Sequence, residues 1–139
     1  MDYYTPKHFK VHEFVTPAVY KKLGENSLLV IDYRMLKTAD AIREFFKAPV
    51  TINTWGYGGD RKFSGFRDST CGIGAKFSQH RFGRALDMLI DDIPASVARQ
   101  VIINNPGRFP YITVMEDDVS WLHVDCRCTV NKEIVLFKP

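Results

Sequence analysis

A small α+β domain, in which helices pack on one face of a small antiparallel sheet, is the fold class that this sequence predicts. Short runs rich in branched and aromatic residues are separated by acidic or glycine-containing turns, which is typical of antiparallel strands. Other segments repeat apolar residues every three or four positions, as helices with one buried side do. The 139 residues suit one domain, 1–139, with a core of its own.

The expected helices begin at capping residues or prolines. Thr16 and the proline after it can open a short N-terminal helix. A longer helix ends near residue 47, just before a proline, and either Asp32 or Ser27 can cap its start. Another begins near Asp92 and ends at an Asn-Pro-Gly turn. The apolar residues that this last helix is expected to bury are Val97, Val101 and Ile102.

Five segments carry strand signals, and one long loop separates the first two. The strands are expected at 50–55, 84–90, 109–115, 119–127 and 133–137. Residues 56–77 are rich in Gly, Ser and Asp and show no sustained period, so we expect a long loop there. Long irregular loops inside compact domains are usually functional.

The stretch 119–128 alternates between chemical and apolar side chains. Because side chains in a strand point to opposite faces with period two, two sets of residues are expected to separate. One face should carry Trp121, His123, Asp125 and Arg127, and the other Leu122, Val124, Cys126 and Cys128. The last two cysteines are therefore expected to pack in the core rather than to bind metal. The third, Cys71, lies in the loop, and an odd number of cysteines argues against a disulfide framework.

Composition and charge exclude several classes of protein. With 45% hydrophobic and 25% charged residues the chain is in the ordinary globular range. A net charge of +3 is mild for a nucleic-acid binder, although it is compatible with an anionic bacterial wall. The N-terminus lacks the pattern of a signal peptide, and no run is long enough to cross a membrane. We expect a monomer made in the cytoplasm that contacts neither nucleic acid nor membrane.

His80, Asp87 and His123 form the candidate metal site. Two imidazoles and one carboxylate suit Zn²⁺ and leave its fourth coordination position open. A second pair, His8 and His12, is spaced i, i+4 and could face one metal on a helix. No third ligand is marked out near that pair, which favours two partly exposed histidines instead.

The two sequence motifs that contain these candidate ligands resemble those of a known protein family. The motifs are Ser78-x-His80-x-x-Gly83-x-Ala85-x-Asp87 and Trp121-x-His123-x-Asp125. They resemble the zinc peptidases that include D-alanyl-D-alanine carboxypeptidases, VanY-like enzymes and phage endolysins, in a superfamily with lysostaphin and the hedgehog signalling domain. Segments 9–14 and 64–67, the latter reading Ser-Gly-Phe-Arg, are similar to that family's opening segment and S-G-[YF]-R motif.

The resemblance implies a fold and a set of roles. The fold would be hedgehog-like or D-Ala-D-Ala-peptidase-like, with zinc held by the two histidines and Asp87. Arg67 would assist the substrate or the developing oxyanion, although a solvated loop arginine is the alternative. Beside the resemblance, the shared strand face predicts that Asp125 accepts a hydrogen bond from a ligating imidazole or pairs with Arg127, rather than binding the metal itself. Ser78 and Trp121 are expected beside the substrate cleft, with packing as the alternative for the tryptophan.

The general base is expected in the acidic turn before the last histidine. Many family members carry a glutamate three residues before that histidine, but Ser120 stands there in this sequence. Glu116 is the first candidate because hedgehog-like members place their glutamate further back, at a strand end. Asp118 is the second candidate and Asp117 the third. The alternative is that all three only form a solvated turn.

The expected function is zinc-dependent hydrolysis of an amide bond in a peptidoglycan stem peptide. The bond would be D-Ala-D-Ala, as in the carboxypeptidases, or L-Ala-D-Glu, as in some phage endolysins. Such a phage lysis or virion enzyme would reach the wall through a holin or with the particle. Two other hypotheses stay open: a zinc-containing wall-binding or signalling module without turnover, and a metal-free fold with incidental histidines.

Overall fold

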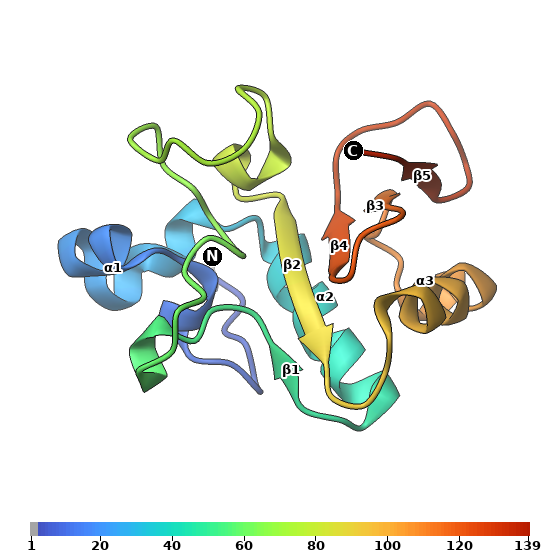
Figure 1. The fold of residues 1–139 in the computed structure, drawn as a ribbon, viewed down its shortest axis with the longest axis horizontal. Coiled ribbons are helices and arrows are strands. Elements are labelled where there is room, and N and C mark those ends of the chain that lie inside the picture. Colours follow the sequence, from blue (N-terminus) through green and yellow to red (C-terminus); the bar gives the residue numbers. More distant parts are fainter. Residues whose placement is uncertain (1–2) are drawn as a thin grey trace.

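A five-stranded mixed sheet and three α-helices make up the fold of residues 3–139, the part of the chain that the computed structural model describes (Figure 1). The strand order in the sheet is β1-β2-β4-β3-β5. The predicted α+β class is thereby confirmed. The strands are β1 (Val50–Thr51), β2 (Ala85–Ile90), β3 (Val114–Glu116), β4 (Leu122–Asp125) and β5 (Val135–Phe137).

One strand pair departs from the antiparallel sheet that the sequence predicted. Strands β1, β2, β4 and β3 pair antiparallel, but β5 runs parallel to β3, with Val114 opposite Val135 and Glu116 opposite Phe137. The expectation of a purely antiparallel sheet was therefore wrong. The reason lies in where the chain returns to the sheet: β4 already has a neighbour on each side, and β5 pairs with the outer edge of β3. Because β4 ends beside the start of β3, the returning chain enters that edge in the same direction as β3.

The helices are α1 (Pro17–Leu23), α2 (Tyr33–Phe46) and α3 (Ala95–Asn104). The Thr16 hydroxyl caps α1 by accepting a hydrogen bond from the Val19 N–H at 3.3 Å. Of the two candidate caps of α2, Asp32 performs that role, since its carboxylate accepts from the Arg34 N–H at 3.0 Å. Ser27 instead lies buried in a 3-10 turn. None of the helices in residues 3–139 is long and apolar enough to cross a membrane.

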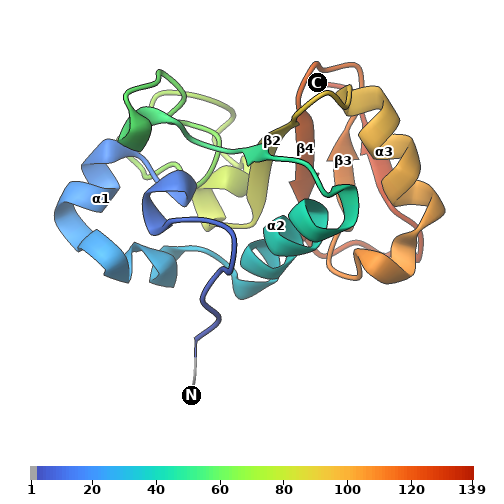
Figure 2. The same cartoon turned by 90° about the horizontal axis from the view of Figure 1, so that it is seen from below.

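The core lies on one face of β2 and β4, beneath α2 and α3. Both helices run alongside the strands in Figure 2. Helix α3 contributes Ala98 and Ile102 to the core rather than Val97, which is half exposed, and Val101, which is only partly buried. The expectation for Val97 was wrong because the inward side of the helix is one residue further along. The other buried residues that the sheet and α2 contribute include Leu36, Ile42, Leu86, Met88, Leu122 and Val124.

For the apolar set, the alternation expected along 119–128 holds only for the length of β4 and one residue beyond. Leu122, Val124 and Cys126 are buried in the core, as predicted. Cys128 is exposed, so the expectation of packing was wrong for that residue. The strand ends at Asp125, and the pleat that sets the facing of each side chain ends soon after it.

The strand expected at 50–55 is also shorter than predicted, because the side chain of Asn53 forms hydrogen bonds with neighbouring loop segments. This side chain donates to the Val15 carbonyl at 3.1 Å and accepts from the Ser64 N–H at 2.9 Å. The chain therefore leaves the sheet after Thr51. The long loop that follows is irregular apart from a 3-10 turn at Trp55–Tyr57, as the sequence predicted.

Candidate metal centre

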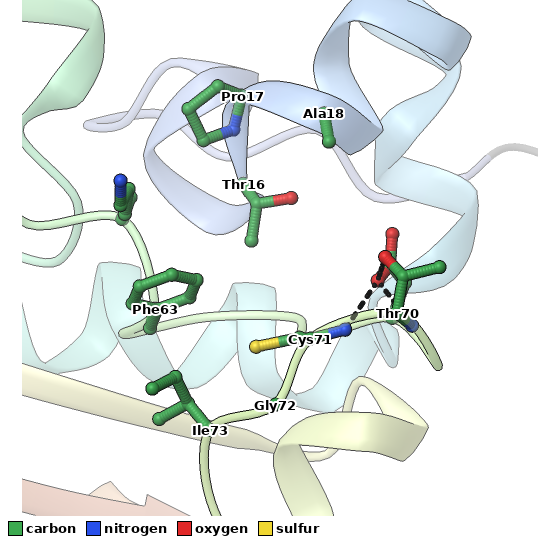
Figure 3. A pocket seen from close by; sticks show the side chains of 10 residues that line it. Thr16, Pro17, Ala18, Phe63, Thr70, Cys71, Gly72 and Ile73 are labelled. Atoms are coloured by element: carbon green, nitrogen blue, oxygen red, sulfur yellow. Dashed lines mark hydrogen bonds between the residues drawn. The ribbon is translucent and has the colours of Figure 1, made fainter.

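Two hollows border the long loop, and only one of them holds a cluster of metal-ligating side chains. The first, about 450 Å³, lies between the start of α1 and residues 62–73 (Figure 3). Its one carboxylate, Asp68, is already bound by the N–H groups of Thr70 and Cys71. The second, about 780 Å³, contains the predicted ligands His80, Asp87 and His123. The second hollow, which we call the cleft, is therefore the candidate functional site.

Three elements bring the predicted ligands together. Asp87 on β2 and His123 on β4 are direct partners in the antiparallel register, so their side chains leave the same face of the sheet. His80 lies on the 3-10 turn Gln79–Phe82 that precedes β2. Gly83 ends that turn with φ +67°, and a Cβ at this position would lie 2.0 Å from the Val30 carbonyl oxygen. Only glycine lets the chain turn there and place the imidazole over β2.

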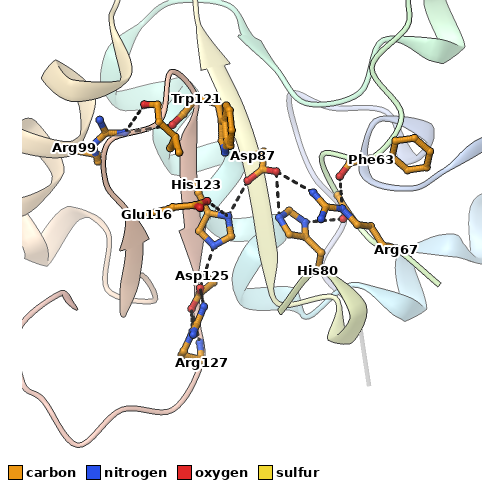
Figure 4. A network of polar contacts seen from close by, with 12 residues as sticks. Phe63, Arg67, His80, Asp87, Arg99, Glu116, Trp121, His123, Asp125 and Arg127 are labelled. Atoms are coloured by element: carbon orange, nitrogen blue, oxygen red, sulfur yellow. Dashed lines mark hydrogen bonds and ion pairs between the residues drawn. The ribbon is translucent and has the colours of Figure 1, made fainter. Parts of the chain in front are cut away.

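The donor atoms converge on Asp87 (Figure 4). Its Oδ1 lies 2.8 Å from His123 Nδ1, and its Oδ2 lies 3.2 Å from His80 Nε2. One donor atom from each of the three residues lies within 4.8 Å of the other two. Both histidines are buried, and Asp87 keeps 9% of its surface exposed. Within residues 3–139 this is the one group of three such residues close enough to hold a metal ion.

The outer nitrogen of each histidine is engaged by an oxygen that can only accept. His80 Nδ1 lies 2.8 Å from the Gly65 carbonyl, and His123 Nε2 lies 3.1 Å from Asp125 Oδ2. Each outer nitrogen must therefore carry the hydrogen. The lone pair of a neutral ring is then left on the inner nitrogen, facing the cluster, as a metal ligand requires. The donor set and its hydrogen bonds thus fit a metal ion.

Asp125 and Arg127 extend the cluster away from the cleft floor. Asp125 is fully buried, and both of its oxygens accept hydrogen bonds from the Arg127 guanidinium. Burial alone would raise the pKa of the Asp125 carboxyl, but the hydrogen bonds from His123 and Arg127 hold it below its usual range. Asp125 therefore remains a charged acceptor for His123, in the position expected for a residue that orients a ligand.

The charges of Asp87 and His123 stabilise each other, and each group shifts the pKa of the other. Burial acts to raise the pKa of Asp87, yet the hydrogen bonds from His123 and His80 hold it well below the usual range. For His123 burial acts in the opposite direction, to lower the pKa. The hydrogen bonds to Asp125 and Asp87 overcome it and raise the pKa of His123 to about 9. Without a metal, a proton on His123 joins the two carboxylates.

Arg67 lies beside the ligand carboxylate. Its Nη2 is 3.2 Å from Asp87 Oδ2, and its Nε donates to the Phe63 carbonyl at 2.6 Å. The residues just before Arg67 are hydrogen-bonded to β2, because the Ser64 carbonyl accepts a hydrogen bond from the Asp87 N–H at 2.8 Å. Gly65 packs so closely that a Cβ would lie 2.1 Å from the Phe14 carbonyl oxygen. The long loop therefore has a rigid base at the site.

The structure separates the three candidate bases. Glu116 ends β3, lines the cleft, and has its Oε2 3.9 Å from His123 Nδ1. Asp118 is exposed and pairs with Lys138 at 2.8 Å, and it is not among the residues that line the cleft. Asp117 lies 3.5 Å from Arg99 of α3. Only the first of the three carboxylates is close to the metal ligands.

Two further residues predicted from the sequence lie in the wall of the cleft. Ser78 and Trp121 both line the cleft, and the tryptophan is 36% exposed. Phe137 of β5, which sequence reasoning missed, places its ring 6.0 Å from that of His123 at 89°. No local signal marks it, since its position depends on the parallel pairing of β5. Of the pair His8 and His12, the first contacts Glu44 and the second lies among aromatic rings. In residues 3–139 neither belongs to a group of three metal-ligating side chains.

Comparison of the chain with protein-family models, with curated proteins and with solved structures found no match. The arrangement of the site therefore carries the functional argument. It defines an α+β domain with a buried His-Asp-His cluster at the floor of a cleft, compatible with a metal centre.

Proposed function

We propose that the chain is a zinc-dependent hydrolase that cleaves an amide bond in a peptidoglycan stem peptide. The observation that carries the proposal is the cluster of His80, Asp87 and His123. Three separate elements supply it, each histidine has its outer nitrogen bound, and the cluster opens into a cleft. A carboxylate and a guanidinium, the groups that amide hydrolysis needs beside a metal, lie next to it.

The two histidines and Asp87 would hold the ion. Zinc bound there supplies a Lewis acid that polarises the amide carbonyl and lowers the pKa of water. Glu116 accepts the proton of the attacking water and returns it to the leaving amine, since it is the one carboxylate of the acidic turn 116–118 that lines the cleft beside the ligands. Arg67 donates hydrogen bonds to the oxygen that gains negative charge, and its contacts with Asp87 and Phe63 hold it in place for that role.

The substrate class rests on the resemblance of the ligand strings to the zinc peptidases of peptidoglycan. The bond would be D-Ala-D-Ala or L-Ala-D-Glu, and the protein would serve lysis or entry of a phage. Purified protein loaded with zinc is expected to release new amino groups from isolated peptidoglycan, and a chelator should abolish the release. Mass spectrometry of the released fragments then identifies the bond. Intact fragments after prolonged incubation with the zinc-loaded protein would reject the proposal.

A matched pair of variants tests the base. Glu116→Gln is expected to lower kcat by about 10²–10⁴-fold while zinc binding is retained, because it removes proton transfer but keeps the shape of the side chain. Asp118→Asn removes a carboxylate from the same acidic turn but outside the cleft, and we expect near-normal turnover. The measurement is the rate of amine release at saturating substrate. The reverse result, with turnover lost only in Asp118→Asn, would transfer the role to that residue.

The second candidate is a wall-binding or signalling module that keeps the zinc but does not turn over. Ser120 favours it, because many members of the family that the chain resembles carry a glutamate at that position. Stoichiometric zinc and tight binding to peptidoglycan, with no new amino groups over days, would support this module over the enzyme. Less than stoichiometric zinc that is insensitive to His80→Ala would reject both.

A further inference from the structure

Arg127 is a cleft residue that the proposed chemistry does not use. It follows β4 by two residues, lines the cleft, and keeps 36% of its side chain exposed. Its Nε and Nη2 donate to the two oxygens of Asp125, and its guanidinium lies 5.3 Å from the centre of the Phe137 ring. Two independent contacts thus hold one cationic group in a fixed orientation at the wall of the cleft.

The hydrogen bonds to Asp125 occupy only one edge of that guanidinium. A guanidinium has five N–H donors on three nitrogens, and a carboxylate bound along Nε and Nη2 leaves the edge formed by Nη1 and Nη2 free. Within residues 3–139 we find no hydrogen-bond partner for Nη1 of Arg127. That free edge matches the two oxygens of a second carboxylate. Because Asp125 and Phe137 already hold the group in place, little side-chain freedom is lost on binding.

The two arginines of the site lie at opposite ends of the cluster. The contacts run from Arg67 through Asp87 and His123 to Asp125 and Arg127 (Figure 4). The arginine beside Asp87 is bound to a ligand of the metal, whereas Arg127 is separated from the metal ligands by Asp125. Arg127 can therefore contact a substrate group other than the carbonyl that is attacked.

We infer that Arg127 binds a carboxylate of the peptide substrate and makes the cleft selective for peptides that carry one near the scissile bond. The inference rests on the proposed function for the identity of the peptide. A stem peptide with lysine at its third position offers two such groups, its C-terminal carboxylate and the α-carboxylate of D-Glu. Both have the same chemistry, so the experiment must distinguish them.

The test is isothermal titration calorimetry of zinc-loaded protein with three forms of one stem pentapeptide. These are the free acid, the C-terminal amide, and the form with the D-Glu α-carboxylate amidated. Every protein carries Glu116→Gln so that the peptides stay intact during the titration. We expect one of the two amides to bind about tenfold more weakly than the free acid, as the loss of a charge-assisted hydrogen-bonded pair predicts. The weaker amide identifies the carboxylate that is recognised.

Arg127→Gln is expected to weaken the free acid about tenfold and to leave that amide unchanged, so that the preference disappears. Arg127→Lys keeps a cation that can reach Asp125 but lacks the free two-donor edge, and we expect it to lose most of the preference while zinc affinity stays close to normal. Lys76→Gln removes an exposed cation from the same cleft. As the matched control for general electrostatic attraction, it should change the acid-to-amide ratio less than about twofold.

Two results would overturn the inference. If Arg127→Gln weakens acid and amide equally, or lowers zinc affinity without changing their ratio, Arg127 acts only by orienting Asp125. If Lys76→Gln abolishes the preference as fully as Arg127→Gln does, the cleft attracts anions without a specific contact. The proposed function fails separately. If the protein with native Glu116 hydrolyses none of the peptides but retains the Arg127-dependent preference, hydrolysis is rejected and the carboxylate site stands.

Discussion

Asp87 lies between the two histidines of the cluster, and its environment decides how the site responds to pH. Two rings and a guanidinium approach its oxygens, so the carboxylate stays charged although it is nearly buried. His123 lies between this carboxylate and Asp125, which explains its raised pKa. A proton and a metal ion therefore compete for the same nitrogen, Nδ1 of His123.

At the residue scale, the apparent zinc affinity is expected to rise about tenfold per pH unit between pH 7 and 9 and then to level off. The reason is that the pKa of His123 is raised to about 9, so that below this pH a proton must leave before zinc binds. The measurement is competition with a chromophoric chelator at several pH values. In Asp125→Asn the plateau should begin at lower pH, because one of the groups that raise the pKa has lost its charge. An affinity that is flat from pH 7 to 9 in the native protein would contradict the competition.

At the scale of elements, the glycine that ends the turn carrying His80 is the most constrained position near the site. Gly83 combines a left-handed backbone with a backbone carbonyl 2.0 Å from where a Cβ would be. Neither feature can relax by rotating a side chain, because the obstructing atom belongs to the main chain of Val30. The segment 64–67 meets the same restriction at Gly65, against Phe14. These close approaches account for the glycines in both motifs.

Gly83→Ala is expected to lower the free energy of unfolding by at least about 1–3 kcal/mol, the cost of a strained backbone position, and to weaken zinc binding by moving His80. The control is Gly107→Ala, where a Cβ would meet no atom within 4 Å and φ is not positive. That variant should change stability by less than about 1 kcal/mol. Denaturant unfolding of both metal-free proteins provides the comparison. Equal free energies of unfolding for the two variants would show that the backbone around Gly83 can shift to accept a Cβ at little cost.

Element boundaries also show why some expectations failed. Trp121, His123, Asp125 and Arg127 all belong to the site, as their alternation predicted, although only two of them lie within β4. Cys128 lies outside the pleat and is exposed. The alternation rule needs a paired strand, and strand pairing ends where neighbouring strands end, which a single sequence does not display.

At the scale of the whole molecule, the cluster links the 3-10 turn before β2 with the two central strands. Without metal, the charged His123 stabilises the fold. Because its pKa in the folded state is raised from 6.5 to about 9, that contribution is complete below about pH 6.5 and is lost as the pH rises through about 9. Zinc replaces the proton between the same groups and should remove this dependence.

The metal-free protein is therefore expected to unfold at a lower temperature at pH 9.5 than at pH 7, whereas the zinc-loaded protein should show a smaller difference. Excess zinc at about one hundred times its Kd should add about 2.7 kcal/mol to the free energy of unfolding. Thermal unfolding with zinc and with a chelator, at both pH values, measures these effects. His123→Gln is the control, since it removes the titrating group and should flatten the metal-free pH dependence. A native metal-free protein that is equally stable at both pH values would argue against the proton bridge.

By itself, the sequence determined the α+β class, the start of a helix at Thr16 and the proline after it, and the three candidate ligands, because each is a local pattern of spacing or alternation. It left Asp32 and Ser27 open as caps of α2. Only the tertiary structure decided the rest. It brought Glu116 rather than Asp118 near the ligands, ran β5 parallel to β3, and set Phe137 beneath Arg127. These features depend on which strand edge stays free after β2, β4 and β3 have paired. That is a property of long-range contacts, and no spacing along the chain encodes it.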